Sequence, residues 1–409
     1  MTHIAPTDNA TRDTEPAPPR PPLIALFLRF LRFGCLAFGG PVAQIAMVKQ
    51  ALVEDERWIS PARFNRLLAV MQILPGPEAH ELCVHLGMVA RGRIGGLLAG
   101  LGFMLPGFVL MLGAAWLYRD WIVGNPGMEP VFLGVQIAVL AIILRAVQRI
   151  GTHILEDKLL WALAVAALGA TLAGVPFWLP LIAAALIYSY AARPAVAASL
   201  FVVAVVLAAA VSSPGLVPGP APLAKAGLAA GDAGVLALFI AGLKGGLLTF
   251  GGAYTAIPYV RGDTVGRGWL SDASFLDGVA LAGMLPAPLV IFATFAGYVA
   301  GGFPGALAIT AGMFLPAFAF SMIFFEKLEA VVENPALHRA LAGVAAAVVG
   351  VIAATLLQLG LATAQRVASP MAGLAIFAGA VAAVILFKGK WVAPMLVVGA
   401  GAAGWLFNP

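Results

Sequence analysis

Apolar stretches of about 20 residues, each long enough to cross a bilayer, follow one another along almost the whole chain. Hydrophobic residues make up 61% of the sequence and charged residues 11%, whereas a soluble domain carries about 25% charged residues. A chain with so few charges cannot cover itself with polar surface, so we expect it to be dissolved in lipid. Because backbone groups must be hydrogen-bonded internally in lipid, stretches of this length predict membrane-spanning helices and an all-α fold.

The sequence predicts a polytopic membrane protein with about thirteen transmembrane segments. The expected spans of the first half are 24–48, 64–90, 94–118, 131–150, 159–175, 177–192 and 195–212. Those of the second half are 233–258, 274–300, 304–325, 337–362, 371–387 and 391–407. The expected domains are a polar, Pro-rich and disordered cytoplasmic tail (1–22), a first repeat (23–212), a linker rich in Pro, Gly and Ala (213–232) and a second repeat (233–409).

The Lys and Arg residues of the loops predict an orientation. With helices that cross alternately, most of them lie on the side that holds the N-terminus, so the positive-inside rule places that end in the cytoplasm and the C-terminus outside an inner (plasma) membrane. The loop 49–66 carries four basic residues on the outer side, and a re-entrant first segment would remove this conflict. The net charge of +5 is spread between apolar stretches, so we expect no nucleic-acid partner.

An internal repeat relates the two halves at an offset close to 212 residues. The matching pairs are FGG at 38–40 and 250–252, WIS and WLS at 58–60 and 269–271, LPGP and LPAP at 74–77 and 285–288, and LPGF and LPAF at 105–108 and 315–318. Several matches in the same order exceed what chance gives between apolar helices. If the first half holds an odd number of spans, the halves insert as two inverted-topology repeats, an architecture of secondary transporters.

Glycine and proline interrupt the expected spans at equivalent places in both halves, which predicts broken helices and a binding site between the repeats near the bilayer midplane. The exposed N–H groups at the N-terminus of a half-helix carry partial positive charge and can hold an anion. The candidate substrate-binding residues are Phe38, Gly39, Gly40, Phe250, Gly251, Gly252, Pro75, Gly76, Pro77, Pro286, Ala287, Pro288, Arg32 and Lys244. The alternatives are close helix packing at the glycines and snorkelling of the two basic side chains toward headgroups.

Ionisable residues follow the first Pro-Gly-Pro motif within the same apolar segment. Such residues are costly in a membrane and mark ion or proton paths, so Glu78, His80 and Glu81 are the candidates for coupling or gating. An ion pair between Glu81 and His85, four residues apart on a helix, is the structural alternative. The spacing HELCVH is one residue longer than the HExxH of zinc proteases, and no phosphate-binding GxxxxGK[ST] occurs. We therefore expect no metal, no cofactor and no direct use of ATP.

These motifs resemble the chromate ion transporter family in its long, two-domain (duplicated) form. The resemblance rests on FGGPVAQIAMV, WIS, LPGPEAHEL and LPGF in the first half and on TFGGAYTAIPYV, GWLSDASFLDG, LPAPLVIFATFAGY and LPAF in the second. It implies a secondary active transporter that exports chromate and so gives chromate resistance, driven by the membrane potential or a proton gradient. Many long members carry Pro-Gly-Pro in the second half, where this chain has Pro286-Ala287-Pro288.

Two other functions stay open at this point. An importer or exchanger of sulfate or another oxyanion would use the same site, because sulfate and chromate are dianions of similar geometry. A membrane-embedded lipid-phosphate hydrolase would need clustered acids with Ser and Arg in both halves, and only the first half has the acids. We therefore expect a transporter and not an enzyme, with an inorganic anion and the lipid bilayer as partners and a homodimer as an open alternative.

Overall fold

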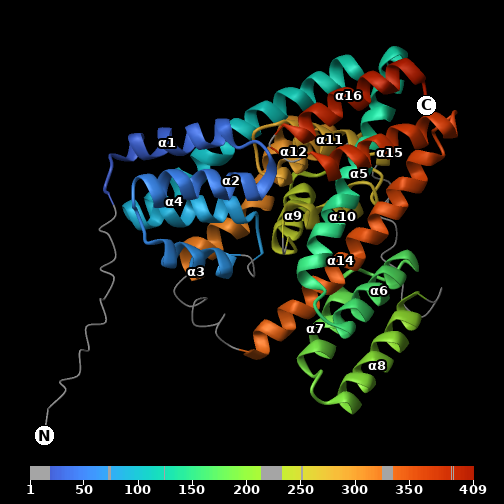
Figure 1. Ribbon diagram of the computed structural model, residues 1–409, viewed down its shortest axis with the longest axis horizontal. Helices are drawn as coiled ribbons and strands as arrows, with labels where there is room; N and C mark the ends of the chain where they lie inside the picture. The colour runs from blue at the N-terminus through green and yellow to red at the C-terminus, as the bar shows by residue number, and fades with distance from the viewer. Residues whose placement is uncertain are drawn as a thin grey trace, which may run out of the picture.

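Helices form all the regular secondary structure of the residues that the computed structural model describes (Figure 1). These residues are 19–71, 75–123, 125–212, 233–249, 252–324, 335–387, 389 and 391–409. The prediction of an all-α chain is therefore confirmed for this part of the protein. The predicted linker, most of the predicted tail, and Phe250 and Gly251 lie outside the described residues.

Most of the predicted spans correspond to one helix, and several correspond to two helices with a break between them. The first half comprises α1 (Leu23–Leu36), α2 (Gly40–Lys49), η1 (Gln50–Asp55), α3 (Pro61–Met71), α4 (Glu78–Leu117), η2 (Tyr118–Ile122), η3 (Pro126–Met128), α5 (Glu129–Ile154), α6 (Lys158–Leu172), α7 (Trp178–Ser189) and α8 (Pro194–Ser212). The second half comprises α9 (Val235–Leu247), η5 (Ala253–Thr255), α10 (Ala256–Thr264), α11 (Asp272–Met284), η6 (Leu289–Ile291), α12 (Phe292–Ala319), η7 (Phe320–Phe324), α14 (Pro335–Ala364), α15 (Pro370–Leu386) and α16 (Val392–Phe407).

The equivalent elements α4 and α12 of the two halves are helical hairpins. In α4 the backbone leaves the helical region at Arg91 and at Gly92, where φ is +63°. In α12 the equivalent residue Gly302 has a φ of +62°. Residues eight apart would be separated by about 12 Å along a continuous α-helix, yet Gly87 packs against the backbone of Gly95. The chain therefore reverses at each kink, and a positive φ at that point favours glycine.

Each hairpin packs in the same way on the first helix of its own half. Gly34 of α1 lies against the backbone carbonyl of Phe103 in α4, and Gly246 of α9 lies against the carbonyl of Met313 in α12. Both glycines bring the two helix backbones close together, as small residues do in membrane proteins. The sequence repeat is thus also a repeat of structure.

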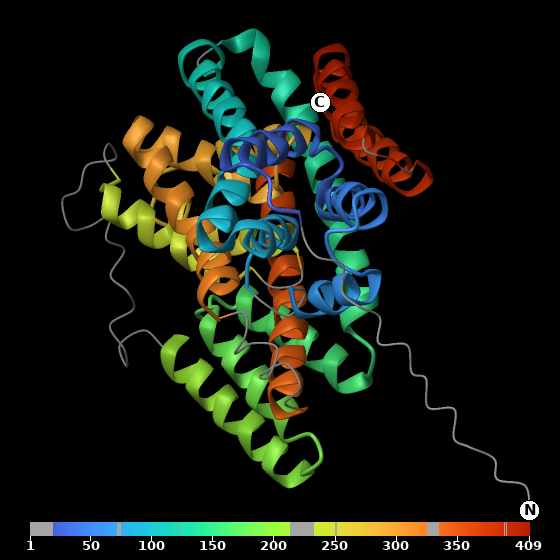
Figure 2. The same ribbon diagram turned by 90° about the vertical axis from the view of Figure 1, so that its left-hand side faces the viewer.

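The last helices of each half pack against the opposite half. Helix α5 contacts α15 and α16, whereas α14 contacts α6 and α7. The contacts are equivalent in detail, because Gly134 of α5 meets the carbonyl of Ala400 and Gly343 of α14 meets that of Ala184. Figure 2 shows the α6–α8 and α15–α16 segments at opposite ends of the molecule. Such reciprocal contacts are those that a two-fold axis between the halves would produce.

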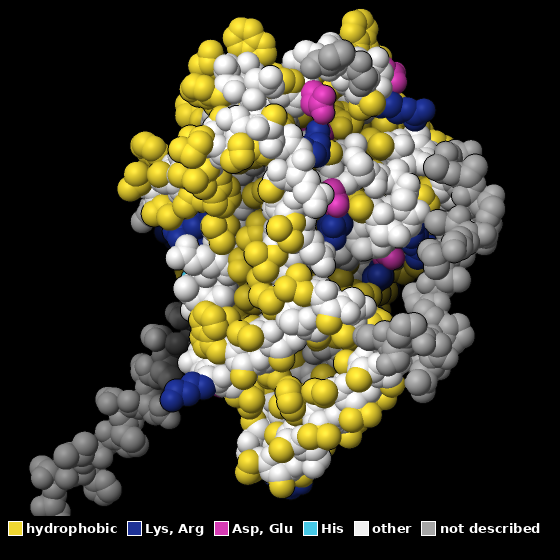
Figure 3. All heavy atoms as spheres, turned by 90° about the vertical axis from the view of Figure 1, so that its right-hand side faces the viewer, with side chains coloured by type: hydrophobic (Ala, Val, Ile, Leu, Met, Phe, Trp, Pro, Cys, Tyr) yellow, Lys and Arg dark blue, Asp and Glu magenta, His cyan; other side chains and the backbone are white. Residues whose placement is uncertain are grey.

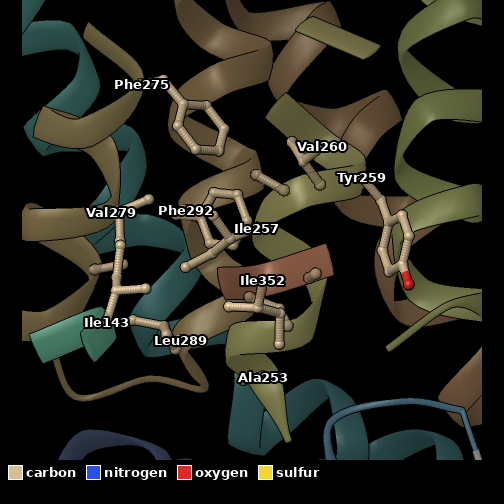
Figure 4. Packing of buried hydrophobic residues seen from close by; sticks show 14 of the residues in the cluster. Ile143, Ala253, Ile257, Tyr259, Val260, Phe275, Val279, Leu289, Phe292 and Ile352 are labelled. Atoms are coloured by element: carbon tan, nitrogen blue, oxygen red, sulfur yellow. The ribbon is translucent and has the colours of Figure 1, made fainter. Parts of the chain in front are cut away.

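A buried apolar core joins the halves where these helices meet. Figure 4 shows Ile143 of α5 close to Leu289 and Val279 of the second half, with Phe292 and Ile352 beside them. This core holds the half-helices of the second repeat against α5 and so positions the breaks described below.

The outer surface is apolar, as a lipid-facing surface must be. Many large hydrophobic side chains are exposed, among them Leu374, Met395 and Trp405, and hydrophobic side chains cover much of the face in Figure 3. Among the described residues, the helical stretches long and apolar enough to cross a bilayer are Glu78–Ile122, Glu129–Ile154, Leu289–Ile323 and His338–Ala364. Two of these stretches contain the hairpin kinks, so they are not single straight spans.

Candidate functional site

The first Phe-Gly-Gly motif breaks the predicted span 24–48 between α1 and α2. Gly39 and Gly40 have φ values of +88° and +79°, a backbone conformation that L side chains rarely adopt. Helix α2 begins at Gly40 with no side-chain cap, so no capping side chain satisfies the N–H groups of its first turn. Phe38 stacks on Trp391 of the second half, with 5.3 Å between ring centroids.

The three other predicted breaks also lie between helices. Pro75–Pro77 separates α3 from α4, and Pro286–Pro288 separates α11 from η6 and α12. Helix α9 ends before the second Phe-Gly-Gly motif, of which Gly252 is described and has a φ of +124°. No side chain caps the helical segments that begin at these breaks. Each break therefore leaves a helix N-terminus with partial positive charge, which can bind an anion.

Contacts between the halves bring these breaks together. The Gly76 N–H donates to the Thr249 carbonyl at 2.8 Å, which joins the first Pro-Gly-Pro to the second Phe-Gly-Gly. The Gln44 side chain donates from Nε2 to the carbonyls of Ala37 at 2.8 Å and Ala287 at 3.0 Å, which joins the other two motifs. Segments η5 and η6 also contact each other. We call this assembly the break cluster; it comprises Phe38–Gly40, Pro75–Pro77, Thr249, Gly252 and Pro286–Pro288.

Small residues of opposite halves face each other across the break cluster. A Cβ placed on Gly107 of LPGF would collide with Ala287 of the second half. In the reciprocal contact, a Cβ on Gly76 would lie 3.3 Å from the Cβ of Ala317 in LPAF. Each contact thus pairs a glycine of the first half with an alanine of the second. The alanine in Pro286-Ala287-Pro288 is accommodated because its neighbour, Gly107, has no side chain.

The acidic residues after the first Pro-Gly-Pro lie at the start of α4. Glu78 is half-buried at the first position of the helix, and Glu81 is completely buried one turn later. The carboxylate of Glu81 lies beside Gly76 and has no hydrogen-bond partner, so the alternative of a hydrogen-bonded Glu81–His85 pair is not observed. His80 is fully buried and packs on Phe314 and Phe318 of the second half, with ring centroids 4.9 and 4.8 Å away. Buried ionisable groups of this kind mark functional sites in membranes.

Three basic side chains differ in how they are placed relative to the break cluster. Lys244 pairs with Asp263 at 2.9 Å and lies over the ring of Phe177, and Arg267 also approaches the same carboxylate at 3.5 Å. Arg32 is exposed on α1. Arg149 of α5 acts electrostatically on Glu78 and on Tyr254 beside the second Phe-Gly-Gly. No local sequence pattern places Arg149 near the breaks, because its approach to the cluster depends on the path of α5.

A buried carboxylate of the second half was also missed. Asp277 of α11 is 3% exposed and receives hydrogen bonds from Tyr118 Oη at 2.7 Å and from Gln136 Nε2 at 2.8 Å. The signal that could have found it is the acidic residue itself within the predicted span 274–300, since intramembrane acids are functional candidates.

A multi-pass, all-helical membrane protein with two similar halves and broken helices that meet between them has the architecture of secondary transporters. Comparison with known sequences agrees with this class. The chain belongs to the chromate transporter family, whose sequence profile matches residues 24–228 and 236–405, one match in each half.

Full-length relatives carry names of the same kind. The chain is 55% identical over 99% of its length to the chromate transport protein of Pseudomonas aeruginosa, of which it covers 97%. It is 33% identical over 92% of its length to the chromate transport protein of Cupriavidus metallidurans, covering 91% of that protein. It is 30% identical over 91% of its length to a probable chromate transport protein of Synechococcus elongatus, covering 93% of it. No solved structure shows a significant match to the chain.

Proposed function

We propose that this protein is a secondary active transporter that exports chromate across the inner (plasma) membrane and so gives chromate resistance. The membrane potential or a proton gradient drives the export. The names of the full-length relatives support chromate as the substrate. The break cluster is the proposed binding site.

The observation that carries this proposal is the meeting of uncapped helix N-termini at the break cluster. The segments after Gly39, Pro77, Gly252 and Pro288 all begin there without a side-chain cap. Their N–H groups favour a negative ligand without a formal counter-charge, and Arg149 adds positive charge nearby. A compact dianion held between two halves could be exposed first to one side of the membrane and then to the other.

Flux of radiolabelled chromate into inverted membrane vesicles tests this function directly. We expect chromate to accumulate when a proton gradient or a membrane potential is imposed, and to leave when the gradient collapses. Unlabelled sulfate in excess distinguishes the substrates: strong competition and comparable sulfate uptake would favour a sulfate or general oxyanion exchanger. Vesicles that accumulate neither anion above those without the protein would refute the proposal.

We expect Glu78→Gln to abolish or uncouple chromate transport. Glu78 is the first residue of the half-helix α4, directly follows Pro77 of the break cluster and interacts electrostatically with Arg149. Loss of its charge removes the negative group that balances Arg149 when the site is empty, which is the gating role proposed here. Glu156→Gln in the exposed loop between α5 and α6 is a matched control and should transport normally. Wild-type flux in Glu78→Gln would remove this residue from the mechanism.

We further propose that the halves insert in opposite orientations, with the N-terminus in the cytoplasm. The reciprocal packing of α5 on α16 and of α14 on α7 supports a two-fold relation between them. Reporter tags at the two ends should then be accessible from opposite sides of the membrane, because the number of spans would be odd. Accessibility of both tags from one side would contradict this topology.

A further inference from the structure

Asp277 is a buried carboxylate that lies outside the break cluster. It lies in the middle of α11, the helix that leads into Pro286–Pro288, and its side chain is almost completely shielded from solvent. A charged side chain at such a place is costly unless it serves a function. Among the described residues, the charged group that acts on it is Arg366, which does not contact it directly.

Neutral donors of the first half hold this carboxylate. Tyr118 of η2 donates to Oδ2 at 2.7 Å, and Gln136 of α5 donates to Oδ1 at 2.8 Å. The Tyr118 hydroxyl also lies 3.3 Å from Oγ of Ser274, one turn before Asp277. The group therefore bridges the two halves of the protein without a salt bridge that would keep it charged.

This geometry can satisfy both protonation states of Asp277. When the carboxylate is charged, it accepts the hydrogen bond from Tyr118. When Oδ2 takes a proton, the new O–H donates to Tyr118 Oη, and the Tyr118 hydroxyl turns to donate to Ser274 Oγ. No buried donor or acceptor is left unpaired in either state, so the main cost of protonation or deprotonation inside the protein is avoided.

A chain of hydrogen bonds links this group to the surface. The Oε1 atom of Gln136, whose amide holds Asp277, accepts from Nη1 of Arg366 at 2.8 Å. Nη2 of Arg366 lies 3.5 Å from a carboxylate oxygen of Glu129, a side chain that is 70% exposed. Among the described residues, the titratable and charged groups linked to Asp277 are thus Tyr118 from η2, Glu129 from α5, and Arg366 from the segment after α14.

We propose that Asp277 is the proton-carrying residue that couples chromate transport to the proton gradient. This inference rests on the proposed function and adds a residue of the second half to the acids of the first. Tyr118 acts as a positioning residue that stabilises both states of the carboxyl group. The hydrogen-bond donors to Asp277 come from the other half. Whether Asp277 is protonated therefore depends on the relative position of the two halves.

The test uses purified full-length protein in proteoliposomes and two assays. Chromate counterflow measures exchange of chromate without net proton movement, and uptake driven by an imposed pH gradient measures coupling. We expect Asp277→Asn to retain counterflow and to lose gradient-driven accumulation and its pH dependence. Asp120→Asn, an exposed aspartate of η2, is the matched control and should keep both activities.

Tyr118→Phe provides a second variant with the carboxylate intact. It should keep gradient-driven accumulation but with a shifted pH profile, because one state of Asp277 loses a hydrogen bond. An unchanged pH profile in this variant would contradict the positioning role.

The outcomes separate the inference from the function on which it rests. Wild-type protein without chromate counterflow would overturn the proposed function and this inference with it. Wild-type protein that exchanges chromate but ignores the pH gradient would overturn the inference alone. So would an Asp277→Asn variant that keeps gradient-driven accumulation, or one that loses counterflow as well.

Discussion

Gly107→Ala is expected to reduce chromate transport strongly, and Ala287→Gly in the same chain is expected to restore most of it. The Cβ added at Gly107 would collide with the Cβ of Ala287, which belongs to the other half and to the break cluster. Overpacking of this kind typically costs about 1–3 kcal/mol, and here the strain falls on the contact across which the halves must move. Removing the opposing Cβ relieves most of it, so the two changes should be strongly non-additive.

Chromate flux and thermal unfolding in detergent, measured for both single variants and the double variant, test this coupling. Gly113→Ala is a matched control, because it lies further along the same helix and a Cβ there would meet no neighbouring atom. A Gly107→Ala variant with normal flux would show that the halves do not pack this closely. A double variant no better than the single would show that the clash lies elsewhere.

Gly39→Leu is expected to block transport while the protein remains inserted in the membrane. Gly39 and Gly40 are both in the left-handed region, where an L residue costs about 1–2 kcal/mol. The chain can avoid this cost by closing the break, which would remove the exposed helix N-terminus, and the leucine side chain would also occupy space beside the cluster. The internal repeat predicts the same sensitivity at Gly251, which lies outside the described residues.

Two further variants separate backbone from side-chain effects. Gly39→Asn should transport better than Gly39→Leu, because asparagine tolerates the left-handed conformation. Gly169→Leu is the control for a glycine-to-leucine change away from the breaks and should transport normally. Gly169 is an exposed helical residue of α6 with open space at the Cβ position. Normal chromate flux in Gly39→Leu would mean that the break is a packing feature with no role in transport.

The helices and their interruptions were largely predictable, because both depend on local signals. Apolar length predicted where helices lie, and the proline and glycine motifs at 75–77 and 38–40 predicted where they break. The hairpin turn of α4 falls at Arg91 and Gly92, between the predicted spans 64–90 and 94–118. Proline removes a backbone donor and glycine permits a positive φ, so these residues act on the chain whatever surrounds them.

The partners of the site residues were not predictable, because they depend on how separate helices pack, often helices of opposite halves. Lys244 was a candidate for the anion site or for snorkelling, and the structure pairs it with Asp263 and places it over the ring of Phe177 in the first half. Asp277 is separated by 159 residues from Tyr118, its closest hydrogen-bond donor. Local sequence spacing cannot predict a contact over such a separation, because the contact forms only when the two halves pack together.

The amino-acid sequence by itself determined that this chain is helical, lies in a membrane, is duplicated and breaks its helices at paired glycine and proline motifs. These properties follow from apolar length, the need to pair backbone groups in lipid and the conformational limits of single residues. Only the tertiary structure decided which motifs meet: Pro-Gly-Pro with the opposite Phe-Gly-Gly, Gly107 with Ala287 and Asp277 with Tyr118. Those contacts depend on how the two halves dock, and docking is set by the shape of whole surfaces rather than by any local pattern.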